Sequence, residues 1–191
     1  METKNSIRKK ILALRDGMPD DERLLFSKNI TDALLKMEQI QQAENILCFA
    51  GYKSEVSTTE LIVSLLNGDK RVFLPRVDGD EMEFYRIQGL QDFEEGYKGI
   101  LEPSMACTEV FRGPVSKETV MLMPGAVFAK DGSRIGYGKG FYDRYLAKHD
   151  IMNRIALCFS SQLLESIPSD AHDKKASVIV TEAGMTECRK V

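Results

Sequence analysis

Hydrophobic residues recur every three to four positions in the first part of the chain, which predicts two helices. Between residues 4 and 16, apolar side chains alternate with Lys and Arg in this rhythm, as in a short amphipathic helix. A second helix is predicted to begin near Pro19. Proline suits the first helical position, and the acids at 20–22 follow it at the positive end of the helix dipole. Apolar residues from Leu25 to Met37 then face a core.

Short apolar runs replace the helical rhythm in the rest of the chain and predict strands. Buried strands are expected at 44–52, 71–77, 119–128, 153–160 and 177–181, with a hairpin or edge strand at 81–87. Helices are expected at 58–67, 141–149 and, as a short one, 161–167, while 88–118 is expected to be irregular. The 58–67 helix has a capping-box pattern, Ser57 with Glu60, at its start and Gly68 at its end.

This alternation of helices and buried strands predicts one α/β domain over residues 1–191. We expect three layers, α/β/α, around a mostly parallel central sheet. Ligands of such sheets bind beyond the carboxyl ends of the strands. The loops that follow the strands at 44–52, 71–77, 119–128 and 153–160 should therefore share one rim.

Composition and charge narrow the class of protein. With 191 residues, 43% of them apolar, the chain can bury a core without disulfides. A net charge of −3 gives no electrostatic reason to expect nucleic acid as a partner. The four cysteines show no metal-binding spacing, and no apolar run approaches the roughly 20 residues that span a membrane. We expect a cytoplasmic protein without a signal peptide, either monomer or homodimer.

Candidate chemistry lies in the glycine-rich run 132–146, GSRIGYGKGFYDRYL, between a predicted strand and a predicted helix start. Three glycines at alternate positions allow close backbone approach, and main-chain N–H groups before a helix form a phosphate site. Lys139 would add a point charge, and Arg134 and Arg144 are near enough in sequence to join it. Asp143, in the first helical turn, either holds Mg²⁺ against bound phosphate or only stabilises the helix dipole.

The common nucleotide motifs do not fit this run. In a Walker A alignment, Gly140 occupies the Ser/Thr place and Ser133 the first glycine place. The spacing also differs from that of the dinucleotide fingerprint. A glycine-rich surface turn with a solvated lysine therefore remains an alternative interpretation.

Residues 124–143 resemble the signature of the 5-formyltetrahydrofolate cyclo-ligase family, PG-x-x-F-x-x-x-G-x-R-[LI]-G-x-G-x-G-[FY]-Y-D. The family's N-terminal K-x-x-x-R matches Lys4 and Arg8. YKSEVST at 52–58 resembles its Y-x-x-x-x-E-[IV]-x-T segment, less one spacer residue. LPRV, Glu102-Pro103 and the acidic tail also correspond, although Ser177 stands where the family has an acid. The resemblance covers nearly the whole chain.

The resemblance implies a reaction in which ATP, with Mg²⁺, converts 5-formyltetrahydrofolate to 5,10-methenyltetrahydrofolate, ADP and phosphate. ATP would phosphorylate the formyl oxygen, and the folate nitrogen at position 10 would attack the activated carbon. Such a phosphoryl transfer asks the protein mainly for positioning and charge.

The resemblance also implies roles for individual residues. The implied ATP-binding residues are Lys4, Arg8, Arg134, Ile135, Gly136, Tyr137, Gly138, Lys139, Gly140, Phe141 and Tyr142. The implied folate-binding residues are Ala50, Glu55, Tyr137, Gly138, Lys139, Gly140 and Phe141. The implied metal ligands are Asp143 and Asp173, and the candidates for catalysis are Lys139 and Arg144.

The folate side leaves several interpretations open. A carboxylate at Glu55 can accept paired hydrogen bonds from the amino-imine edge of a pterin, but it can also be an ordinary loop acid. Phe84, Tyr85 and Met123 line either the folate pocket or only the core.

Two other functions use the same features. One is a non-catalytic nucleotide- or phosphosugar-binding module. The other is a sugar-phosphate isomerase, for which Glu55 and Glu102 would be the acid/base pair.

Overall fold

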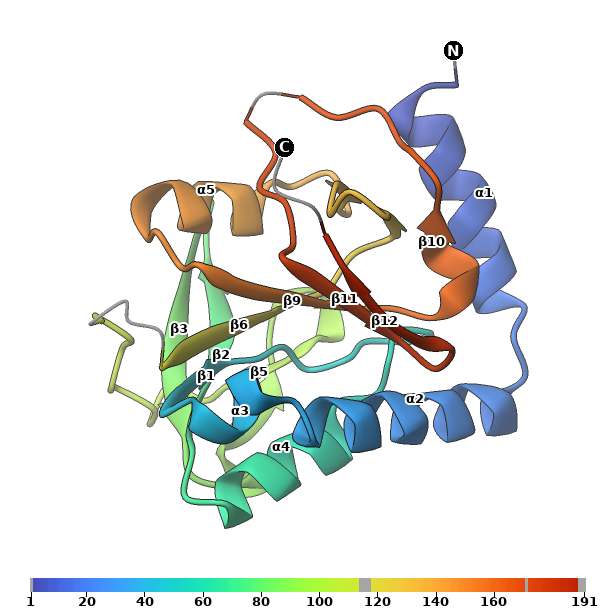
Figure 1. Ribbon diagram of the computed structural model, residues 1–191. Helices are drawn as coiled ribbons and strands as arrows, with labels where there is room; N and C mark the ends of the chain where they lie inside the picture. Colours follow the sequence, from blue (N-terminus) through green and yellow to red (C-terminus); the bar gives the residue numbers. More distant parts are fainter. Residues whose placement is uncertain (1, 114–117, 171, 189–191) are drawn as a thin grey trace.

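A seven-stranded sheet in the order β12-β11-β9-β6-β1-β2-β3 forms the centre of the molecule (Figure 1). This computed structural model describes residues 2–113, 118–170 and 172–188. The inner strands are parallel: β11 (Val178–Thr181), β9 (Asn153–Leu157), β6 (Thr119–Met123), β1 (Asn45–Leu47) and β2 (Arg71–Asp78). The edge strands β12 (Gly184–Glu187) and β3 (Glu81–Ile87) are antiparallel to their neighbours. The predicted α/β class with a mostly parallel sheet is confirmed.

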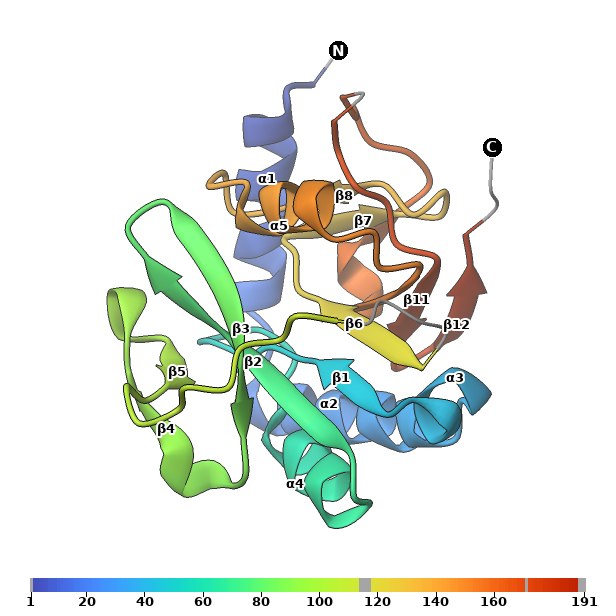
Figure 2. The same cartoon turned by 90° about the vertical axis from the view of Figure 1, so that its left-hand side faces the viewer.

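Helices α2 (Asp20–Leu35), α3 (Glu38–Gln42) and α4 (Thr59–Asn67) cover one face of this sheet (Figures 1 and 2). Ile30 of α2 and Leu61 of α4 are buried in one core cluster with strand side chains such as Val120. The opposite face is covered as well, so strand residues are buried on both sides. Burial on both faces is why these strands appear in the sequence as continuous apolar runs.

The opposite face carries a second small sheet as well as a helix, which the predicted α/β/α layering did not include. Helix α5 (Phe141–Lys148) packs beside β10 (Leu163–Leu164), β7 (Val127–Ala129) and β8 (Arg134–Ile135), which form a three-stranded sheet. Helix α1 (Lys4–Asp16) packs through Ile7 and Ile11 on the far side of that sheet (Figure 2). Residues of α1 and the first residues of α5 both line the cleft described below.

Four predicted elements end early or change type. The run predicted as one strand at 119–128 breaks at Pro124, which lacks the N–H that a ladder needs, and continues as β7 in the small sheet. The strands predicted at 44–52 and 153–160 end at Leu47 and Leu157. The predicted helix at 161–167 was wrong, since a 3₁₀ turn (Ser160–Gln162) leads directly into β10.

The predicted capping box of α4 is also wrong. Its N-cap is Thr58, whose hydroxyl donates to the carbonyl oxygen of Phe49 at 2.6 Å and accepts from the N–H of Gly51 at 3.0 Å. The N–H of Ser57 instead donates to the Ser27 hydroxyl at 3.0 Å. These bonds fasten the loop that follows β1, which lines the site described below.

Residues 88–118, expected to be irregular, contain regular structure. A hairpin of β4 (Phe93–Glu95) and β5 (Leu101–Pro103) lies beside β2 and β3 (Figure 2). A 3₁₀ turn at Leu90–Asp92 precedes it, and another at Tyr97–Gly99 connects its two strands. Strand β12 was missed, because its exposed, polar residues carry no apolar run. Among the described helices, none has the length and apolar character that crossing a membrane requires.

Candidate active site

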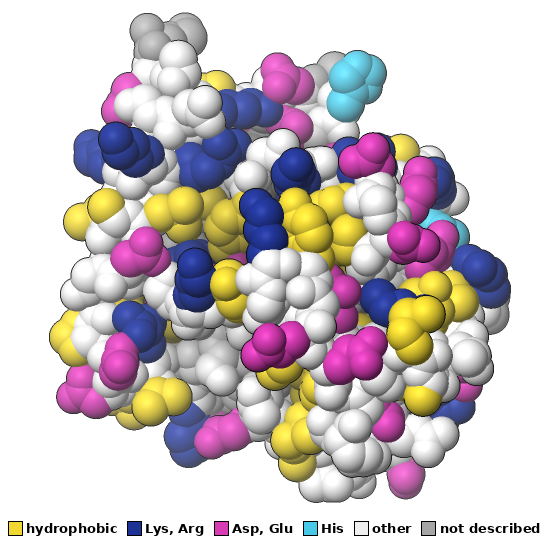
Figure 3. All heavy atoms as spheres, turned by 180° about the vertical axis from the view of Figure 1, so that it is seen from behind, with side chains coloured by type: hydrophobic (Ala, Val, Ile, Leu, Met, Phe, Trp, Pro, Cys, Tyr) yellow, Lys and Arg dark blue, Asp and Glu magenta, His cyan; other side chains and the backbone are white. Residues whose placement is uncertain are grey.

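A cleft of about 630 Å³ opens at the carboxyl edge of the parallel strands. It is bounded by α1, the loop after β1, the β2–β3 hairpin, the turn between β4 and β5, and the glycine loop, residues 136–140, that leads into α5. Figure 2 shows these segments converging from distant parts of the sequence. On the face seen in Figure 3, hydrophobic side chains form a band with Lys and Arg side chains gathered above it.

The structure brings nearly all of the predicted site residues together around this cleft. Those that line it are Lys4, Arg8, Ala50, Glu55, Arg134, Ile135, Gly136, Tyr137, Gly138, Lys139, Gly140, Phe141, Tyr142, Asp143 and Asp173. Arg144 is exposed and is not among the lining residues. Its guanidinium instead donates to the carbonyl oxygens of Lys139 at 2.6 Å and Asp80 at 2.9 Å. It therefore ties the glycine loop to the β2–β3 hairpin.

Backbone geometry explains the glycines of the loop. Gly138 and Gly140 have φ values of +91° and +67°, in the left-handed region that residues with a Cβ rarely adopt. At Gly136, a Cβ would come within 2.9 Å of the Arg134 guanidinium. Gly140 is also the N-cap of α5 and has no side-chain cap, so the first N–H groups of that helix remain for a ligand.

Cationic side chains surround the glycine loop. Arg8 donates from Nε to the carbonyl oxygen of Gly136 at 2.8 Å. Lys4 bonds Asp173 at 2.5 Å, from across the cleft rim. Burial alone disfavours the charged form of Asp173, but the N–H of Asp170 and the Lys4 ammonium outweigh it and hold the pKa below its ordinary value. The Lys139 ammonium makes no hydrogen bond or ion pair with any residue that the structure describes.

Arg134 lies beneath the loop and is almost fully buried. It donates to Asp143 Oδ1 at 3.0 Å, and the same oxygen accepts from the N–H of Lys174 at 3.2 Å. The Arg134 Nε atom has no hydrogen-bond partner within the described part of the chain. Arg134 therefore shapes the floor of the loop and fixes the orientation of Asp143.

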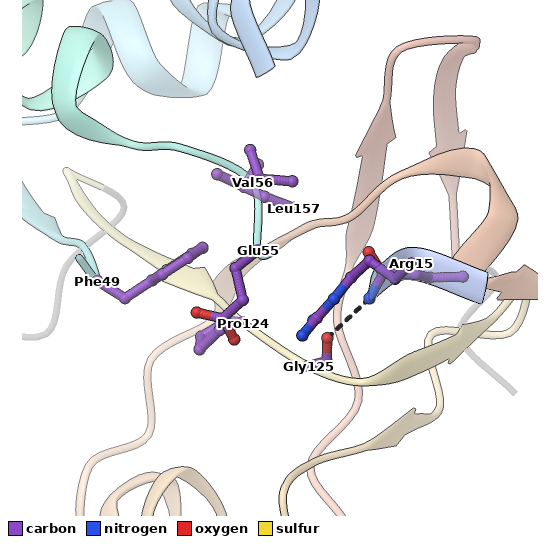
Figure 4. Close-up of a pocket in the computed structure, with 8 residues that line it drawn as sticks. Arg15, Phe49, Glu55, Val56, Pro124, Gly125 and Leu157 are labelled. Atoms are coloured by element: carbon purple, nitrogen blue, oxygen red, sulfur yellow. Dashed lines mark hydrogen bonds between the residues drawn. The ribbon is translucent and has the colours of Figure 1, made fainter. Parts of the chain in front are cut away.

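Glu55 is partly buried in the cleft, and both of its oxygens accept hydrogen bonds. The Tyr137 hydroxyl donates to Oε1, and the N–H of Tyr52 donates to Oε2 at 2.9 Å. Burial raises the pKa of Glu55 above its ordinary value, opposed by these two donors and by the positive charge of Arg15. Figure 4 shows Arg15 and Glu55 entering the same space beside Pro124 and Gly125.

The sequence analysis missed Arg15, although its position carried a signal. Lys4, Arg8 and Arg15 are spaced by four and seven residues, which places them on one face of α1. All three line the cleft. The row of basic residues on a helix that packs through Ile7 and Ile11 was therefore a signal that Arg15 belongs to the same site as Lys4 and Arg8.

None of Phe84, Tyr85 and Met123, whose role the sequence left open, lines the cleft. Phe84 and Met123 are fully buried in a cluster with α5 and do not line the cleft. Tyr85 packs under Arg76, whose guanidinium lies 3.6 Å from the ring centroid. The apolar wall of the cleft instead comes from the β2–β3 hairpin and the β4–β5 turn, through Pro75, Val77, Met82, Tyr97, Ile100 and Leu101.

Comparisons with known proteins agree with this site. The model of the 5-formyltetrahydrofolate cyclo-ligase family matches residues 1–182. The 5-formyltetrahydrofolate cyclo-ligase of Mus musculus is 27% identical over 94% of this chain and 93% of its own. That of Haemophilus influenzae is 27% identical over 89% of this chain and 92% of its own. The 5,10-methenyltetrahydrofolate synthetase of Aquifex aeolicus has the same fold, with a TM-score of 0.84, 30% identity and coverage of 98% of this chain and 94% of its own. This chain belongs to the 5-formyltetrahydrofolate cyclo-ligase family.

Proposed function

We propose that this protein uses ATP to convert 5-formyltetrahydrofolate to 5,10-methenyltetrahydrofolate, with ADP and phosphate as the other products. Family membership supports the activity. The observation that carries the proposal is the shape of the cleft. It combines a glycine loop among cations with an apolar chamber beside the Glu55 carboxylate, which Tyr137 of the loop contacts. A nucleotide and a folate can therefore lie side by side.

The glycine loop is the proposed site of the ATP phosphates. Backbone without side chains allows phosphate oxygens to approach, and the uncapped start of α5 favours negative charge. Lys139 has no competing partner within the described residues, so its ammonium is free to meet the transferred phosphoryl group. Lys4 and Arg8, on the same face of α1, would neutralise the remaining phosphate charge.

Asp143 and Asp173 are the proposed ligands of Mg²⁺. Among the described residues, no group of three or more acidic, His or Cys side chains forms a metal site by itself. This suits magnesium, which takes one or two carboxylates together with substrate phosphates and keeps several waters. Arg134 and the N–H of Lys174 occupy Asp143 Oδ1, which leaves Oδ2 for the metal. Bound there, Mg²⁺ would withdraw charge from the phosphate oxygens.

The apolar chamber is the proposed folate site. Glu55 has two accepting positions on each carboxylate oxygen, and the protein uses one of each. The remaining positions can accept the paired N–H groups of a pterin edge. The ring system would then rest on the apolar side chains of the β2–β3 hairpin and the β4–β5 turn.

In this arrangement the formyl oxygen attacks the terminal phosphorus of ATP, and ADP leaves. Nitrogen 10 then attacks the formyl carbon and loses its proton, and phosphate departs with the former formyl oxygen. The protein contributes position and charge rather than a covalent intermediate. Arg144 would act through the loop, because it holds the Lys139 carbonyl and does not line the cleft.

Absorbance tests this function, because the methenyl product absorbs in the near ultraviolet at longer wavelength than the 5-formyl substrate. The protein is mixed with substrate and Mg²⁺, with and without ATP. We expect the product band only when ATP is present. Folded protein that binds ATP but produces no band would contradict the proposal and favour a non-catalytic nucleotide-binding module.

A further inference from the structure

A buried arginine lies behind the folate end of the cleft. Arg15, near the C-terminal end of α1, is only 5% exposed. Its Nε donates to the Ser54 hydroxyl at 3.0 Å, and one terminal nitrogen donates to the Tyr137 hydroxyl oxygen at 2.7 Å. Its nearest acidic oxygen is on Asp16, 3.9 Å away, and Asp16 itself accepts from Ser54. An almost fully buried guanidinium is costly unless it is well bonded, so its position calls for a reason.

These bonds fix the direction of a hydrogen-bond relay. Arginine has donors only, so the Tyr137 oxygen must accept from Arg15. The single hydrogen of that hydroxyl is then directed to Glu55 Oε1, its closest acceptor, since the Gly125 carbonyl oxygen lies farther away at 3.4 Å. Each hydrogen bond of the relay therefore has a fixed donor: Arg15 of α1 donates to Tyr137 of the glycine loop, and Tyr137 donates to Glu55 in the loop after β1. The last acceptor is the Glu55 carboxylate, which lines the cleft.

We propose that Arg15 is a positioning residue for folate recognition, because it sets the Tyr137 hydroxyl and thereby holds the Glu55 carboxylate in place for the pterin edge. This inference rests on the proposed function, since it assumes that Glu55 receives the folate. In this proposal Arg15 acts through Tyr137 and Ser54 rather than by contact with a substrate. Ser54 gives it a second anchor in the loop that carries Glu55, so one guanidinium fork aligns two segments that lie far apart in the sequence.

Calorimetric titration of the whole protein tests this role, with 5-formyltetrahydrofolate and MgADP as separate probes. Tyr137→Phe removes the relay without altering a buried charge. Arg15→Lys keeps the charge but cannot bond both Ser54 and Tyr137 with a fork. We expect each variant to weaken folate binding about tenfold, the size expected from loss of a charge-assisted hydrogen bond, while MgADP binding changes less than about twofold.

Arg23→Met is the matched control. Arg23 is a partly buried arginine that donates to the main-chain carbonyl oxygen of Met18 at 2.7 Å, close to the end of α1, but it does not line the cleft. It is expected to leave both affinities unchanged, whatever its effect on stability. Arg15→Lys combined with Tyr137→Phe should weaken folate binding no more than the stronger single change, because both break one relay.

Three results would overturn the role of Arg15: unchanged folate affinity in folded Tyr137→Phe or Arg15→Lys protein, equal losses for folate and MgADP, or fully multiplying effects in the double variant. Because binding is measured without turnover, this outcome is separate from the fate of the proposed reaction. A wild-type protein that binds 5-formyltetrahydrofolate but forms no product would refute the reaction and still test Arg15.

Discussion

Replacing Lys139 by Met separates catalysis from folding more sharply than any other change in the cleft. The side chain is exposed, and its ammonium bonds to no residue in the described ranges. Exposed substitutions of this kind change the free energy of unfolding by less than about 0.5 kcal/mol. The melting temperature should therefore move by no more than about 2 °C.

The expected effect on turnover follows from the charge that Lys139 would place beside the transferred phosphoryl group. Two unit charges 4 Å apart interact by about 4 kcal/mol at an effective dielectric constant of about 20. Removing one preorganised group that stabilises transition-state charge typically lowers kcat by about 10²–10³-fold. We expect a loss in this range for Lys139→Met in the absorbance assay.

Lys148→Met provides a control of equal charge. Lys148 lies on the same helix, α5, but is not among the cleft residues and pairs with Glu81 at 2.6 Å. Its substitution should leave kcat within about twofold of wild type, since surface pairs contribute little. Equal losses in the two variants would show a general charge effect, and full activity in Lys139→Met would refute the role of its ammonium.

Three further changes test other parts of the site. Burial raises the pKa of Glu55, so its carboxyl stays protonated to a higher pH than usual, and calorimetry should show folate affinity rising as the pH increases through that pKa. Glu55→Gln should weaken folate binding more than MgADP binding and should remove this pH dependence. Equal losses of both affinities would contradict the role of Glu55. Arg144→Ala should weaken MgADP binding several-fold, roughly 1 kcal/mol, because the Lys139 carbonyl loses its hydrogen bond. An unchanged dissociation constant would show that this hydrogen bond does not support nucleotide binding. Gly138→Ala forces a side chain into φ +91°, so a strain of roughly 1–2 kcal/mol should lower the melting temperature by a few degrees, and an unaltered melting curve would contradict the loop geometry.

The parts of the site that could be predicted from the sequence are those in which the local backbone conformation determines the residue type. Gly138 and Gly140 have positive φ values, which favour glycine. The spacing of these glycines therefore reflects the loop conformation as well as the family signature. Lys4 and Arg8, spaced by four residues, had to share a helix face, and that face meets the cleft. The parallel sheet followed from apolar runs separated by helices.

What the sequence did not predict depends on contacts between distant segments. The hydrogen bond from Arg15 to Tyr137 joins residues 122 positions apart in the sequence. Helical periodicity predicts which face of α1 carries Arg15, but not which distant segment that face contacts. The break at Pro124 was visible, but nothing local indicated that β7 would join β8 and β10 in a separate sheet. Strand β12 is a polar edge strand, stabilised by its pairing with β11 rather than by burial of its own side chains.

A crystal structure with MgADP and 5-formyltetrahydrofolate bound tests the central claim most directly. The account predicts diphosphate oxygens against the main chain of residues 136–140 with the Lys139 ammonium beside them, and the pterin edge on Glu55 in the same cleft. A nucleotide bound away from the glycine loop, or a folate outside this cleft, would contradict it.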